Sequence, residues 1–307
     1  MNVVVIGGAG FIGSHLVDRL LSHDHTVDVI DDLSTGSLAN LADARAVGGG
    51  LKIHHLDATS TEADSLIGMR RPDVIHVLTT LPPSDQPSAA HARAFQVVLA
   101  VLEAARRHGV GKVVVAVPAT ALHGHPTSRA LPLKDVDIGQ LVPRGVRGVV
   151  ARASVDLLVA FRDLHAIEFT ALAMATVYGP RQRADGGVVG AFVHAATNAS
   201  APVIDGDGRQ TRDLLYVDDA VDALARAGER GGGLLVNVGT GVQTSVGELW
   251  NRIATLVPGA SDLLALHGPA RSDELARFAI SPVRARIHLA WSPWTDLDDG
   301  LTRLVEG

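Results

Sequence analysis

Three glycines near the start of the chain are spaced as in a loop that binds the phosphates of a nucleotide. Gly7, Gly10 and Gly13 follow the apolar run NVVVI and open a segment with helical character. A tight turn between a strand and a helix favours residues without a β-carbon, and the free N–H groups of the helix N-terminus attract a pyrophosphate. The spacing therefore predicts a dinucleotide site, with Phe11 and Ile12 beside the glycines.

Acidic residues at the ends of the next two apolar runs suit the adenosine half of such a dinucleotide. Asp31, followed by Asp32, lies roughly 20 residues beyond the third glycine, where a carboxylate accepts from the ribose hydroxyls and repels a 2′-phosphate. The pattern favours NAD over NADP, and a simple turn residue is the alternative for Asp31. Asp57 is placed to meet the adenine amino group, or else it caps the following helix. Ala58 and Leu78 complete the predicted cofactor site.

The elements that would hold these residues are short apolar runs that alternate with helical segments. The runs are continuously apolar, which is typical of strands buried on both faces. Strands alternating with helices indicate right-handed βαβ units. The sequence therefore predicts an α/β fold with a doubly wound, Rossmann-like parallel sheet, whose strands cover residues 2–7, 26–31, 51–57, 73–78, 112–117 and 169–175.

The pattern changes after residue 178, where Gly, Pro and charged residues cluster in GPRQRADGG. Segments beyond this point are shorter and less regular. We therefore predict a dinucleotide-binding domain over residues 1–178 and a smaller substrate-binding lobe over residues 179–307. Elements of the lobe are expected to return to the first domain.

Composition narrows the class of protein. The chain of 307 residues has no cysteine, which excludes disulfides, thiol catalysis and cysteine-bound zinc. Its net charge of −6 and the absence of a basic run give no indication of nucleic-acid binding. No apolar run reaches the roughly 20 residues of a membrane span, and no signal peptide precedes the first strand, so a cytoplasmic protein is expected.

Five sequence blocks resemble those of extended short-chain dehydrogenases/reductases of the nucleotide-sugar epimerase/dehydratase type. The blocks are GGAGFIGSH, DDLSTG, VYGPRQ, GDGRQTRDLLYVDDAVDA and VNVGTGVQTSVGEL, and they occur in the family's order. The resemblance covers nearly the whole chain. It implies NAD as the cofactor, a nucleoside diphosphate sugar bound between the lobes, and a homodimer built on helices within residues 91–108 and 149–164.

The same resemblance assigns two arginines to the substrate diphosphate. Arg212 in GDGRQTRD and Arg271 in GPARSDE lie where the family places them, and a guanidinium matches phosphate oxygens in charge and geometry. The alternative is a surface ion pair with Asp213 or Asp273. Thr176 stands where the family has an asparagine that contacts the substrate, so the pocket wall differs from the family's at this point.

The family's proton relay is missing from the expected positions. Relatives use a Ser or Thr, a Tyr, and a Lys four residues after the Tyr. The corresponding positions here hold Ala119, Arg147 and Ala151, and an asparagine expected beneath the cofactor is Ala94. An arginine cannot act as a base at ordinary pH. The chain's two tyrosines belong to other blocks, and neither is followed by a lysine four residues later.

Two nearby residues are candidate replacements for the relay. Thr120 would supply the hydroxyl if the backbone shifts by one position relative to the family. An imidazole ordinarily titrates near neutrality, and His123 lies at the carboxyl edge of the predicted sheet, where ligands bind. A solvent-facing loop histidine is the alternative, and His125 would line the same loop. No third ligand follows at a supporting spacing, so no metal site is predicted.

Three functions remain open at this point. The first is an NAD-dependent enzyme that acts on a nucleotide sugar or a natural-product intermediate with a repositioned acid or base. The second is an enzyme that keeps the fold but performs a non-redox isomerisation, cyclisation or dehydration. The third is a non-catalytic protein that binds NAD or another ligand.

Overall fold

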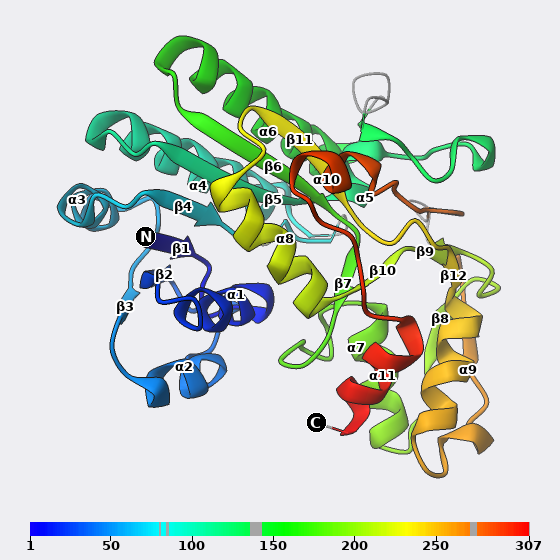
Figure 1. Cartoon of the computed structure of the whole chain (residues 1–307). Helices are drawn as coiled ribbons and strands as arrows, with labels where there is room; N and C mark the ends of the chain where they lie inside the picture. Colours follow the sequence, from blue (N-terminus) through cyan, green and yellow to red (C-terminus); the bar gives the residue numbers. More distant parts are fainter. Residues whose placement is uncertain (80, 84–85, 136–142, 271–274, 307) are drawn as a thin grey trace.

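A seven-stranded parallel sheet forms the centre of the molecule (Figure 1). The computed structural model describes residues 1–79, 81–83, 86–135, 143–270 and 275–306. The strand order β11-β6-β5-β4-β1-β2-β3 runs outward from β1 in both directions, which is the predicted doubly wound arrangement. The strands are β1 (Asn2–Ile6), β2 (Thr26–Asp31), β3 (Leu51–His55), β4 (Val74–Val77), β5 (Lys112–Pro118), β6 (Glu168–Met174) and β11 (Leu234–Val238).

Six of these strands are the six apolar runs of the sequence. The seventh, β11, comes from beyond residue 178 and pairs in parallel with β6, with Leu234 opposite Thr170 and Val238 opposite Met174. The large sheet therefore includes residues from both predicted lobes. The boundary at residue 178 stays a prediction, and it falls at the end of a short strand, β7 (Thr176–Tyr178).

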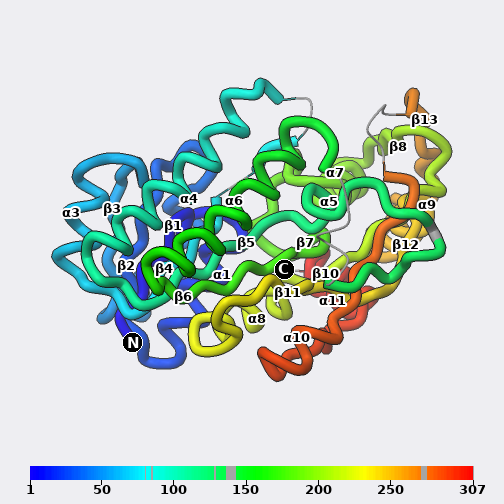
Figure 2. Tube along the Cα trace, turned by 90° about the horizontal axis from the view of Figure 1, so that it is seen from above, coloured from blue at the N-terminus to red at the C-terminus, as the bar shows by residue number. Residues whose placement is uncertain are grey.

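Helices cover both faces of the sheet (Figure 2). On one face α4 (Ser88–His108) packs against α6 (Gly145–His165) and α3 (Thr61–Arg70); on the other, α1 (Phe11–Leu21) packs against α8 (Val217–Glu229). Because α4 and α6 connect parallel strands, their N-termini lie at the carboxyl edge of the sheet. Within the described ranges, no helix combines the length and apolar character of a membrane span.

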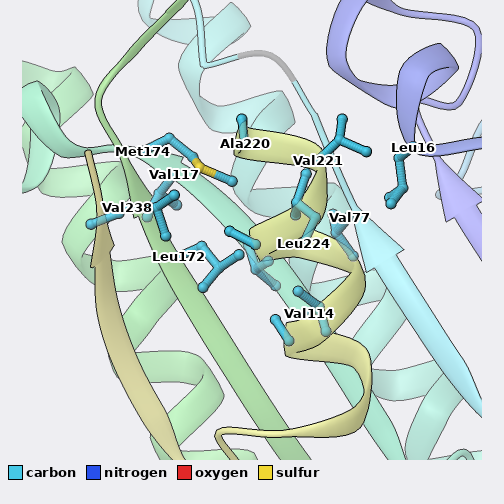
Figure 3. Close-up of a cluster of buried hydrophobic side chains, with 14 of the residues drawn as sticks. Leu16, Val77, Val114, Val117, Leu172, Met174, Ala220, Val221, Leu224 and Val238 are labelled. Atoms are coloured by element: carbon cyan, nitrogen blue, oxygen red, sulfur yellow. The ribbon is translucent and has the colours of Figure 1, made fainter. Parts of the chain in front are cut away.

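The apolar core between the sheet and α8 is shown in Figure 3. Helix α8 presents small and branched apolar residues at helical spacing, and they meet the buried side chains of the central strands. Burial of these surfaces is the main force that holds α8 on the sheet. The contacting residues include Val77, Val114, Val117, Leu172, Met174 and Val238 from the strands and Ala220, Val221 and Leu224 from α8.

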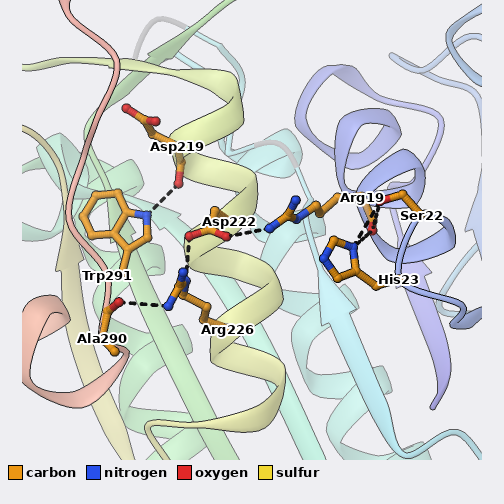
Figure 4. Close-up of polar contacts among 8 residues, drawn as sticks. All are labelled: Arg19, Ser22, His23, Asp219, Asp222, Arg226, Ala290 and Trp291. Atoms are coloured by element: carbon orange, nitrogen blue, oxygen red, sulfur yellow. Dashed lines mark hydrogen bonds and ion pairs between the residues drawn. The ribbon is translucent and has the colours of Figure 1, made fainter.

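Polar contacts fix α8 to its neighbours (Figure 4). The Asp222 carboxylate accepts from Arg19 of α1 at 3.0 Å and from Arg226 at 2.6 Å. The indole N–H of Trp291 donates to the carbonyl oxygen of Asp219 at 2.9 Å. These contacts join α1, α8 and the C-terminal arm.

Beyond β7 the chain builds a smaller lobe from two-stranded sheets and helices. β7 pairs in parallel with β10, β8 pairs in parallel with β13, and β9 pairs antiparallel with β12. Helix α9 packs against both α7 and α11. The elements are α7 (Val188–Thr197), β8 (Val203–Asp205), β9 (Thr211–Arg212), β10 (Leu214–Tyr216), β12 (Thr244–Ser245), α9 (Val246–Leu256), β13 (Leu266–Gly268), α10 (Val283–His288) and α11 (Leu297–Glu306).

Short helices occupy the connections of both lobes. They are the 3-10 helices at Leu38–Leu41, Ser128–Ala130 and Ala260–Asp262, and the α-helices α2 (Ala42–Val47) and α5 (Ala119–His123). Of these, α5 follows directly on the carboxyl end of β5 and packs on α6. It therefore carries its residues to the edge of the sheet where the other site residues lie.

Candidate active site

The glycine turn joins β1 to α1 at the carboxyl edge of the sheet. Gly7 has φ +79°, and a β-carbon there would lie 2.8 Å from the carbonyl oxygen of Leu78. At Gly13 a β-carbon would lie 2.1 Å from the Gly7 carbonyl oxygen, so both positions require glycine. At Gly10 it would meet only that same oxygen, at 3.2 Å. The turn is therefore open at Gly10, where backbone N–H groups can approach a pyrophosphate.

Asp31 shapes the same turn. Its carboxylate accepts from the backbone N–H of Ala9 and from that of Leu33, each at 2.8 Å, and the residue is buried. A carboxylate has about four lone-pair positions, so two remain for ribose hydroxyls. Asp31 thus holds the turn in place, and its predicted contact with the ribose stays a prediction.

Sequence reasoning missed Arg93, which bridges the two other predicted adenosine carboxylates. Its Nη2 lies 2.7 Å from Asp57 Oδ2 and 3.5 Å from Asp32 Oδ2. The N-cap of α3 is Ser60, whose hydroxyl accepts from the Ala63 N–H, so the alternative in which Asp57 caps this helix is wrong. Nothing in the sequence distinguishes Arg93 from the other arginines of its helix. The remaining predicted cofactor residues, Phe11, Ile12, Ala58 and Leu78, are all half-buried.

We expect Asp31→Ala to lower the affinity for NAD by at least about tenfold, because the loss of one charge-assisted hydrogen bond is worth about 1.5–3 kcal/mol. Calorimetry should show micromolar or tighter binding of NAD to the wild type and weaker binding of NADP. Asp185→Ala is the control, because that carboxylate is exposed, pairs with Arg183 and is not part of the predicted cofactor site. Equal affinity of the wild type for both dinucleotides, or binding of neither, would contradict this expectation.

The positions of the expected relay come together where α5 meets the start of α6. Thr120 Oγ1 lies 3.5 Å from Arg147 Nη1, and both side chains are half-buried. Ala119 is fully buried. Thr120, rather than the position of Ala119, therefore brings an oxygen next to Arg147.

Ala94 and Ala151 line one small cavity between α4, α6 and the end of β5. Its volume is about 10 Å³, and Thr79, Pro118 and Ser154 also line it. A cavity of this size holds about one water molecule. The two positions at which the resemblance expects an asparagine and a lysine thus face the same small space.

His123 is not the solvent-facing loop residue that was the alternative for it. It ends α5 and is fully buried, with Nε2 3.1 Å from Asn237 Oδ1 and its ring edge-on to Phe278. Because Asn237 Nδ2 donates to the carbonyl oxygen of Leu133, its Oδ1 is the acceptor, and we assign the hydrogen to His123 Nε2. His125 is exposed and does not share this environment.

Neither tyrosine is tuned to act as a base. The Tyr178 hydroxyl lies 3.4 Å from the carbonyl oxygen of Leu297. Burial raises the pKa of both Tyr178 and Tyr216, whereas a catalytic phenolate requires a lowered pKa. Among the described residues, no three His, Asp or Glu side chains lie close enough together to hold a metal ion.

The predicted substrate residues Thr176 and Arg212 lie in neighbouring segments, Thr176 in β7 and Arg212 in β9, just before β10. The Thr176 N–H donates to the carbonyl oxygen of Asp213 at 2.9 Å, which places β7 beside β10. Arg212 Nη1 donates to the carbonyl oxygens of Thr211 and Leu275, each at 2.8 Å. Arg212 therefore ties β9 to the segment that follows residue 274.

The alternative in which Asp213 forms a surface ion pair with Arg212 is wrong. Asp213 is fully buried, and its carboxylate accepts from the backbone N–H groups of Thr240, Gly241 and Ile280. It is a structural residue that sequence reasoning missed. Arg271 and Asp273 lie outside the described residues.

Comparison with known proteins decides the family. The family model described as "NAD dependent epimerase/dehydratase family" matches residues 3–239. A UDP-glucose 4-epimerase from Mycolicibacterium smegmatis is 38% identical over 320 residues, covering 100% of this chain and 98% of its own length. The chain belongs to the NAD-dependent epimerase/dehydratase family. NAD is accordingly its cofactor, and the open glycine turn fits the pyrophosphate of this dinucleotide.

Solved structures of other epimerases agree with the fold of this family member. UDP-glucose 4-epimerase with UDP-glucose from Thermotoga maritima superposes with a TM-score of 0.92 at 29% identity, covering 100% of this chain and 98% of that one. UDP-glucose 4-epimerase in complex with NAD from Thermus thermophilus gives 0.87 at 26% identity, with the same coverage. The α/β fold with its smaller second lobe is therefore that of the epimerases in this family.

Proposed function

We propose that the protein is an NAD-dependent enzyme that acts on a UDP-sugar through a proton relay different from Ser, Tyr and Lys. Full-length similarity to UDP-glucose 4-epimerases supports the substrate class. The contact between Thr120 and Arg147 at the relay positions is the observation that supports a different proton relay. Under this proposal a hydroxyl and a permanent cation take the positions at which the resemblance expects a hydroxyl and a phenol.

Each residue of this site would have a separate role in the reaction. Bound NAD would supply the hydride acceptor. Thr120 would hydrogen-bond the reacting hydroxyl, and Arg147 would donate to an oxygen that becomes negative, because its guanidinium has donors and no acceptor. His123, which ends the same short helix as Thr120, would take the proton.

The test is a single-turnover measurement of NADH formation with UDP-sugars. We expect His123→Ala to abolish NADH formation and turnover without weakening NAD binding. His125→Ala, two residues away and exposed, should behave as wild type and serves as the matched control. Full activity of His123→Ala would remove His123 from the relay.

A second candidate, a protein that binds NAD and a nucleotide without chemistry, is favoured by one observation. His123 is fully buried and its Nε2 is hydrogen-bonded to Asn237, as in a residue with a structural role. Binding of UDP-glucose without any formation of NADH or epimer would support this candidate over the enzyme.

The diphosphate contact of Arg212 is part of the proposal and has its own test. UDP should raise the melting temperature of the wild type, because it binds the folded state only. It should do so much less in Arg212→Ala and Arg271→Ala. Arg209→Ala, whose side chain is 90% exposed and pairs with Asp207, is the control. If UDP raises the melting temperature of the double variant, Arg212→Ala with Arg271→Ala, as much as that of the wild type, a diphosphate at these arginines is excluded.

We also propose a homodimer that uses the outer faces of α4 and α6. These helices pack on each other, and Leu99, Val149 and Val159 are exposed along them. Apolar residues exposed along paired helices are typical of a protein–protein contact. Sedimentation equilibrium should report twice the mass of the chain.

A further inference from the structure

A set of polar contacts joins the cofactor-binding helix to the turn through which the chain enters the second lobe. His15 Nε2 donates to the carbonyl oxygen of Pro180 at 2.9 Å. Arg181 Nη1 lies 2.7 Å from Asp18 Oδ2, and its Nη2 lies 3.2 Å from Asp43 Oδ2. We call these residues, His15, Asp18, Asp43, Pro180 and Arg181, the clasp. Its α1 side belongs to the helix whose N-terminus forms the glycine turn.

Arg181 is held in the clasp by an unusual backbone conformation. Its φ is +65°, in the left-handed region that residues other than glycine rarely adopt, and its side chain is only 20% exposed. Such conformations cost free energy and persist where surrounding contacts determine them. Arg183, two residues later, instead pairs with Asp185 on the surface, and these two side chains are 60% and 70% exposed.

The far side of the clasp leads directly to the substrate residues. Pro180 and Arg181 follow β7, which contains Thr176 and pairs in parallel with β10. The Thr176 N–H donates to the carbonyl oxygen of Asp213, the residue after Arg212. A displacement of the turn relative to α1 would therefore shift both Thr176 and Arg212.

We propose that the clasp couples the two ligand sites, so that the nucleotide sugar binds more tightly once NAD is in place. NAD held at the N-terminus of α1 restricts that helix, and Arg181, as a positioning residue, transmits the restriction to β7 and β10. The inference rests on the proposed function in taking the second ligand to be a UDP-sugar. By linkage, UDP would increase the affinity for NAD by the same factor.

The test is the dissociation constant of UDP measured by calorimetry with and without saturating NAD. Wild type should bind UDP about fivefold or more tightly with NAD, within the usual range of coupling between sites. In Arg181→Met, which keeps the apolar stem, this ratio should fall to about one while the affinity for NAD alone changes by less than about threefold. Arg183→Met is the matched control and should keep the wild-type ratio. Arg181→Lys, which can still pair with Asp18, should restore part of it.

Two results would overturn the proposal: a wild-type ratio near one, or an unchanged ratio in Arg181→Met. If UDP does not bind the wild type at all, the proposed function fails while the clasp stays testable by hydrogen exchange. NAD should then slow amide exchange across residues 176–182 in the wild type and not in Arg181→Met. Absence of this protection in the wild type would dismiss the coupling independently of the substrate.

Discussion

The combined change Ala119→Ser, Arg147→Tyr and Ala151→Lys should raise the rate of UDP-glucose epimerisation by roughly a hundred- to ten-thousand-fold, the usual worth of general acid–base catalysis. The wild type should be correspondingly slow if, as proposed, Arg147 takes the position at which the resemblance expects a phenol. The lysine would start from the wall of the cavity beside Ala94, and because this cavity has a volume of only about 10 Å³, neighbouring side chains must move to admit the lysine stem. A coupled assay for UDP-galactose measures the rate.

Two further variants show which side chain is responsible for any increase in the epimerisation rate. Arg147→Phe in place of Arg147→Tyr keeps the ring without its hydroxyl and should leave the triple variant at the wild-type rate. Omission of Ala119→Ser asks whether Thr120, whose Oγ1 already lies near residue 147, supplies the hydroxyl. A wild-type turnover in the range of ordinary enzymes, about 1–10³ s⁻¹, would show that this relay is dispensable.

Asp213→Ala should lower the free energy of unfolding by about 3 kcal/mol or more. The carboxylate is fully buried and accepts from three backbone N–H groups and from the Thr240 hydroxyl. Each buried donor left without a partner costs about 1–3 kcal/mol. Urea denaturation measures the change, and a shift below about 1 kcal/mol, no more than one ordinary hydrogen bond is worth, would contradict the expectation.

A milder change at the same site provides the control for Asp213→Ala. Thr240→Val removes the hydrogen bond that the hydroxyl donates to Asp213 and the one that it accepts from the exposed Val242 N–H. It leaves the three backbone donors paired with Asp213, so it should cost about 1–2 kcal/mol. The same carboxylate holds the loop after β11 and the segment at Ile280 next to β9. Loss of UDP binding in Asp213→Ala should therefore accompany the loss of stability.

Features of the fold that depend on local patterns could be predicted from the sequence. The six apolar runs form strands, because a continuous apolar run is buried on both faces of a sheet. The glycine turn follows β1 directly, because a tight turn excludes residues with a β-carbon. The place of β11 in the large sheet could not be predicted, because LLVNV is short and its partner strand β6 lies some 60 residues earlier in the chain. Leu234 pairs with Thr170.

Features of the site that depend on distant partners could not be predicted. The burial of His123 follows from Asn237 and Phe278, which are far away in the sequence. The bridge from Arg93 to Asp32 and Asp57 joins three elements of the sheet edge. Asp213 entered the sequence analysis only as the partner in an alternative surface ion pair, because an acidic residue beside Arg212 has no local feature that marks it as buried.

The origin of β11 has a consequence for how this architecture can change over time. A chain ending at residue 178 would lack the strand that completes the sheet and the helix α8 that covers one of its faces. The bare edge of β6 would then present unpaired backbone groups, which promote aggregation. The second lobe is thus not an interchangeable module: a recombination that exchanged it would have to carry α8 and β11 along. We therefore expect the lobe to change by substitution within it rather than by its replacement.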